Sequence, residues 1–76
     1  MNDQDIVVRT VNGGVHRLAT RSSIPEFFER LDGQVRSTGH ISQVFMETVD
    51  GRWIGAAHVV EVWQVPAGGS IYEGLA

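Results

Sequence analysis

Residues 52–65, RWIGAAHVVEVWQV, decide the fold, because they hold both tryptophans and the densest run of β-branched side chains. Any core that this chain builds has to be assembled against them. Successive side chains of a strand point to opposite faces. The apolar residues of the run therefore divide into two sets, Val59, Trp63 and Val65 on one face and Val60 and Val62 on the other. A strand with one exposed face would alternate apolar and polar residues, so this pattern predicts a strand covered on both faces.

Turn signals lie on both sides of this strand. Asp50-Gly51 follows the loosely alternating residues 41–49 and is typical of a two-residue hairpin loop, which needs positive φ angles. Residues 55–58 contain few β-branched side chains and predict a bend or a single helical turn, while Pro66 ends the final strand. This strand–bend–strand ending resembles the layout at the end of small Sm-like or SH3-like barrels, although no family motif accompanies it.

The N-terminal part predicts a second hairpin, because two β-branched runs flank Asn12-Gly13. Two registers compete. A two-residue loop of Asn12-Gly13 pairs Val7 with Leu18, whereas a loop that includes Gly14 sets two arginines opposite each other. Like charges opposite each other are destabilising, so we favour the first register.

A helix is expected to begin at Ser23, since residues 23–26, SIPE, match a capping box and proline is tolerated in the first turn. Helical spacing puts four apolar side chains on one stripe that we expect to pack in the core: Ile24, Phe27, Phe28 and Leu31. Gly33 is expected to end the helix as a left-handed cap, followed by a loop over residues 34–40. A helix of about nine residues would not hold alone in water, so it must dock on a sheet.

The composition argues against nucleic-acid and membrane partners. The formal net charge of −3 repels nucleic-acid phosphates. Residues 53–60, the longest stretch near the middle without a fully charged side chain, fall far short of the ~20 residues of a membrane span. The acidic, polar first five residues are unlike the basic start of a secretory signal. We therefore expect a cytoplasmic protein.

The arginines of the first hairpin are the candidate ligand contacts. All six basic residues of the chain are arginines, and a guanidinium group binds carboxylate or phosphate oxygens as a planar fork. Three of them precede the predicted helix N-terminus, where backbone N–H groups favour anions. The candidate anion or ligand contacts are Arg9, Arg17, Arg21, Ser22 and Ser23.

Metal and catalytic sites are not expected. His16, His40 and His58 share no short spacing of the kind that metal ligands use. No serine lies in a G-x-S-x-G elbow, and without cysteine no thiolate site can form. We therefore expect no metal, no cofactor, no catalytic residue and no enzymatic activity.

These patterns predict one α+β domain over residues 1–66. Its expected elements are a small curved antiparallel sheet of about five strands, either open or closed as a barrel, and one packed helix. Their expected order is β-β-α-β-β-β. Residues 67–76 are expected to be a tail that is either flexible or docked through Ile71, Tyr72 and Leu75.

The expected function is that of a non-enzymatic adaptor or regulatory module that associates with itself and with an unidentified protein partner. One short helix cannot cover every apolar strand face, and the final strand carries no lysine or internal proline to discourage edge pairing. A homodimer is favoured, with an interface at Val59, Glu61, Trp63 and Val65. The alternative is a small-ligand or nucleotide-binding protein that uses the hairpin arginines and the helix N-terminus.

Overall fold

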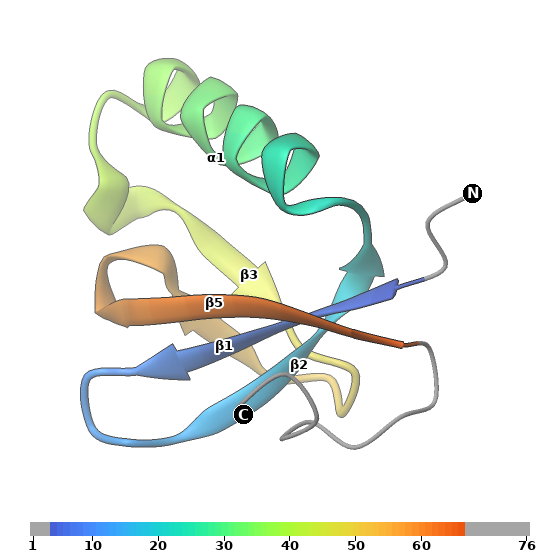
Figure 1. Ribbon diagram of the computed structural model, residues 1–76. Coiled ribbons are helices and arrows are strands. Elements are labelled where there is room, and N and C mark those ends of the chain that lie inside the picture. The colour runs from blue at the N-terminus through green and yellow to red at the C-terminus, as the bar shows by residue number, and fades with distance from the viewer. Residues whose placement is uncertain (1–3, 67–76) are drawn as a thin grey trace.

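The computed structural model describes residues 4–66, which form five strands and one α-helix (Figure 1). In chain order the elements are β1 (Gln4–Thr10), β2 (Val15–Arg21), α1 (Ile24–Thr38), the 3₁₀ turn η1 (Ile41–Gln43), β3 (Phe45–Glu47), β4 (Trp53–Gly55), the 3₁₀ turn η2 (Ala56–His58) and β5 (Val59–Pro66). The predicted α+β class, the element order and the single turn before the last strand are confirmed. The predictions on residues 67–76 fall outside the described residues.

The strands form two antiparallel sheets rather than one sheet or a closed barrel. One has the order β2-β1-β5 and the other pairs β3 with β4. An isolated bridge between Leu18 and Thr48 links them. The α-helix packs where the sheets separate, since Phe27 lies in one core cluster with Leu18, and Met46 packs against that cluster. Figure 1 shows α1 lying across this side of the strands.

The strand covered on both faces is β1, not β5 as the sequence pattern predicted. Ile6, Val7 and Val8 are all fully buried: Ile6 and Val8 belong to the core cluster with Phe27, and Val7, on the other face, lies opposite Arg17 of β2 and Trp63 of β5. Within residues 4–66, β5 pairs with β1 alone and is therefore an edge strand, on which Val60 is 64% exposed. The sequence could not separate the two strands because both are rich in valine.

The predicted assignment of β5 side chains to faces is wrong for Val59. Pairing with β1 changes register between Arg9, which faces Glu61, and Thr10, which faces Val59. Such an irregularity adds one residue and reverses the alternation of side chains beyond it. Val59 therefore packs against the core together with Val62, not on the face of Trp63.

The helix is longer than predicted, with 15 residues, and it continues through Gly33 to Thr38. Its end is set by Gly39, whose φ of 90° is left-handed and whose N–H donates to the Val35 carbonyl. The expected loop over residues 34–40 is therefore wrong for most of its length. Ion pairing of Arg36 with Asp32, 2.8 Å apart and one turn away, favours the additional turn.

The two adjacent phenylalanines of α1 have different environments. Phe27 is 9% exposed and belongs to the core cluster, whereas Phe28 is 49% exposed. The prediction that both pack in the core is wrong for Phe28, because consecutive helical residues point about 100° apart. Their rings still make an edge-to-face contact with centroids 5.3 Å apart.

Both hairpins have the same type of turn, formed by two similar tetrapeptides: TVNG at residues 10–13 and TVDG at residues 48–51. In each, the glycine N–H donates to the threonine carbonyl, and the glycine φ is 88° or 84°. The hydroxyl groups of Thr10 and Thr48 donate to the Asn or Asp side chain two residues on.

Each loop therefore has three residues, with the valine included. In the first hairpin Val7 pairs with Arg17 and Val8 with His16. The favoured register, Val7 with Leu18, is wrong because it assumed a loop of two residues.

Candidate functional site

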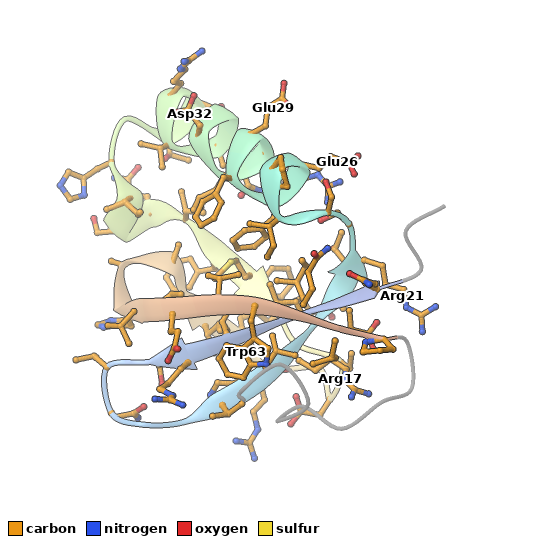
Figure 2. The ribbon with its side chains drawn as sticks, in the orientation of Figure 1. Arg17, Arg21, Glu26, Glu29, Asp32 and Trp63 are labelled. Carbon is orange, nitrogen blue, oxygen red and sulfur yellow. The ribbon has the colours of Figure 1, made fainter. Side chains whose placement is uncertain are left out.

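Two of the candidate arginines meet at a buried carboxylate on the sheet face away from α1. Arg21 Nε lies 2.8 Å from Asp5 Oδ1, and Arg17 Nε lies 3.3 Å from Asp5 Oδ2. The Asp5 side chain is 4% exposed. Strand pairing brings the three together, because Asp5 is opposite Arg21 and Val7 opposite Arg17 in the β1–β2 ladder. Figure 2 shows Arg17 on the side of the sheet opposite α1, near Trp63.

The third candidate, Arg9, interacts with β5. Its Nη1 lies 3.2 Å from Glu61 Oε1, and its guanidinium carbon lies 5.9 Å from the ring centroid of Trp63. This places Arg9 within reach of a cation–π interaction. All three hairpin arginines thus have a carboxylate of the same chain beside them.

At the start of α1 the capping box occupies the helix N-terminus. The Glu26 N–H donates to Ser23 Oγ, while Glu26 Oε1 accepts from the Ser23 N–H and hydroxyl. These hydrogen bonds lower the pKa of the Glu26 carboxyl below its ordinary value. A carboxylate therefore already stands where a bound anion would lie. Ser22 is 6% exposed, and its hydroxyl has no hydrogen-bond partner within the described residues.

The four candidate interface residues on β5 do not share an exposed face. Val65 has no exposed surface, and Val59 packs against the core. Trp63 is half-buried, and Glu61 is exposed but paired with Arg9.

Large apolar side chains are exposed elsewhere on the molecule. Seven in residues 4–66 are more than one third exposed: Val11, Phe28, Ile41, Phe45, Val49, Trp53 and Val60. Val11 and Val49 occupy the two matching turns. The remaining five lie beside the two flanks of α1, where the helix meets the strands. The sequence alone did not identify this surface, because the helix position was needed to bring its parts together.

One flank of α1 forms a groove against β2, β3 and β4, here called the α1–β3 groove, with a volume of about 230 Å³. Its lining residues are Leu18, Thr20, Phe27, Arg30, Leu31, Gln34, Phe45, Met46, Glu47 and Trp53. Phe45 is 54% exposed and Trp53 63% exposed. In the β3–β4 ladder Phe45 is opposite Gly55 and Glu47 opposite Trp53, so the side chains of Phe45, Glu47 and Trp53 share one face.

The other flank forms the α1–β5 groove, with a volume of about 320 Å³. The exposed side chains at this groove are Phe28, Ile41 and Val60, from α1, η1 and β5. Glu61 also lines it. This groove therefore has an apolar lining with one acidic residue that Arg9 already neutralises.

A third hollow lies beside the turn of the first hairpin, with His16 and His58 in its lining. Within residues 4–66 no group of three or more histidine or carboxylate side chains is placed to hold a metal ion. Among the same residues no helix has the length and apolar character needed to cross a membrane.

Comparison with known proteins adds no functional assignment. No protein-family model matches this chain, and no curated protein and no solved structure matches it.

Proposed function

We propose that this protein is a non-enzymatic interaction module that associates with itself and, in that form, binds a protein partner. The observation that carries the proposal is the pair of exposed aromatic side chains, Phe45 and Trp53, beside the α1–β3 groove. Aromatic residues are enriched at protein interfaces, and contiguous exposed apolar patches mark interaction sites.

The apolar side chains that remain exposed in the folded chain support the same proposal. A chain of 76 residues can bury only about 60% of the surface that it exposes when unfolded. The single α-helix of residues 4–66 covers part of the strands and leaves Phe28 and Val60 exposed on its other flank. Burial of such side chains against a second copy, most often through a two-fold axis, is the commonest way to remove them from water. A dimer is the form that we favour, and the absence of cysteine is in line with a cytoplasmic location.

The alternative function, ligand or nucleotide binding through the hairpin arginines, has less support. A site for an anion needs uncompensated positive charge, whereas Arg17 and Arg21 share the Asp5 carboxylate and Arg9 pairs with Glu61. At the helix N-terminus, the Ser23 side chain is engaged with Glu26.

Native mass spectrometry of the protein purified from its source tests both functions, because it reports the oligomer mass and any retained ligand together. The proposal predicts the mass of two chains without added ligand mass. A single chain of 8.4 kDa would contradict self-association. A single chain that carries the mass of a nucleotide would favour the alternative.

A further inference from the structure

The α1–β3 groove has the size of a pocket for side chains. Its volume of about 230 Å³ is below the roughly 300–1,000 Å³ of ordinary small-molecule sites. Its lining is mostly apolar and includes Phe27, Leu31 and Met46. Such a pocket fits an aromatic or aliphatic anchor from another protein surface, and anchors of this kind dominate binding energies.

The charges on its walls distinguish this groove from the rest of the surface. Five of the six arginines form ion pairs within residues 4–66: Arg9, Arg17, Arg21, Arg36 and Arg52. Arg30, on the helix wall of the groove, forms none in that range. Glu26, one turn away from it, is hydrogen-bonded to Ser23, and the charge of Arg30 makes only a smaller contribution to the lowered pKa of Glu26 than those hydrogen bonds do. On the opposite, strand wall, Glu47 likewise forms no ion pair with any described residue.

We propose that the α1–β3 groove is the two-fold interface between two copies of this chain. This inference rests on the self-association proposed above and names its surface. A two-fold axis brings the same patch of both copies together. If residue i of the first copy contacts residue j of the second, then residue j of the first copy also contacts residue i of the second. A patch with one cation and one anion is then complementary to itself. Arg30 of each copy faces Glu47 of the other, and the exposed Trp53 and Phe45 of each copy pack at the partner's groove.

Charge reversal tests this pairing. Arg30→Glu places two pairs of like charges across the axis, and so does Glu47→Arg. Each single variant is expected to weaken the dimer at least tenfold. An equimolar mixture of the two variants restores opposite charges at both contacts, one native and one reversed. Sedimentation velocity should therefore show two monomeric variants that form a dimer when they are mixed.

Glu29→Arg is the matched control, because it changes the net charge as much as Glu47→Arg does but Glu29 does not line the α1–β3 groove. It should sediment like the parent. Circular dichroism checks that each variant is folded. Should a charge variant fail to fold, Trp53→Ala, which truncates an exposed side chain, provides the second test and should also weaken the dimer at least tenfold.

The outcomes separate the inference from the function on which it rests. A parent that sediments as a monomer overturns self-association itself. A dimeric parent whose charge variants and Trp53→Ala remain dimeric overturns the groove as its interface and leaves self-association standing. Monomeric single variants that fail to associate on mixing overturn the pairing between copies, since an Arg30–Glu47 contact within one chain would give that result.

Discussion

Leu18 of β2 forms an isolated antiparallel bridge with Thr48, and the two residues are only 4% and 2% exposed. Beside the bridge, the Val49 N–H donates to the Arg17 carbonyl across 2.9 Å. Thr20 and Met46, two residues beyond it on each strand, line the α1–β3 groove instead of continuing the ladder. The end of the pairing thus creates the groove that we propose as the interface.

The hydroxyl of Thr48 is expected to lower the pKa of the Asp50 carboxyl. Its hydrogen bond is the largest cause of an Asp50 pKa below the ordinary value. The pKa of Asp50 is therefore lower in the folded protein than in the unfolded chain. The ionised carboxylate stabilises the folded protein fully at a pH above the pKa of the unfolded chain, and this stabilisation is lost as the pH falls through the pKa of the folded protein. Thr48→Val should raise the pKa of Asp50 and flatten the acid dependence of the melting temperature. NMR titration of the Asp50 carboxyl measures the shift; an unchanged pKa would contradict it.

Local sequence signals predicted where the helix begins and where the chain turns, but not how the strands are arranged in the sheets. The capping box of Ser23 and the turn at residues 56–58 were predictable, because each depends on residues within one or two turns. The central position of β1 was not, because β1 and β5 have similar apolar content and pairing is a property of the whole sheet. Gly33 resembles a helix end in the sequence because a glycine often ends a helix, but the left-handed cap is Gly39.

For the candidate site too, the sequence identified individual residues but not the contacts between distant parts of the chain. The sequence identified Arg9, Arg17 and Arg21 as candidate anion or ligand contacts, but it could not show that Asp5 and Glu61 lie beside them. The α1–β3 groove combines residues from four elements, so it needs the tertiary structure.

Substitution of the two phenylalanines tests the orientation of α1. Phe27→Ala should cost about 3–5 kcal/mol of unfolding free energy, as expected for a buried aromatic side chain. Phe28→Ala, at an exposed position next to it, should cost less than about 1.5 kcal/mol. Urea denaturation measures both. A larger loss for Phe28→Ala would mean that the helix presents its other flank to the core.

Two glycine substitutions test where the helix ends. Gly33 lies within the helix, and the methyl group of an alanine there would meet no other atom within 4 Å. Gly33→Ala should therefore stabilise the protein by about 0.5–1 kcal/mol. Gly39→Ala should instead destabilise it by roughly 1 kcal/mol, since an alanine is strained at a φ of 90°. Thermal unfolding compares the two, and destabilisation by Gly33→Ala would restore Gly33 as the helix end.

The buried carboxylate of Asp5 is expected to be structural. Asp5→Ala removes it from beside Arg17 and Arg21, and because the Arg21 side chain is 57% exposed and can be solvated, the loss should be about 1–3 kcal/mol. The control, Asp32→Ala, breaks an exposed pair with Arg36 and should cost no more than about 0.5 kcal/mol. Chemical denaturation at pH 7 gives both values. Equal losses would show that the Asp5 group contributes no more than a surface ion pair.

Self-association of the chain is the central claim. Sedimentation equilibrium of the unmodified protein, from low micromolar to several hundred micromolar, measures its mass directly and over the range in which a dimer would form. We predict a mass that rises with concentration to that of two chains. A mass that stays at 8.4 kDa at every concentration would contradict self-association.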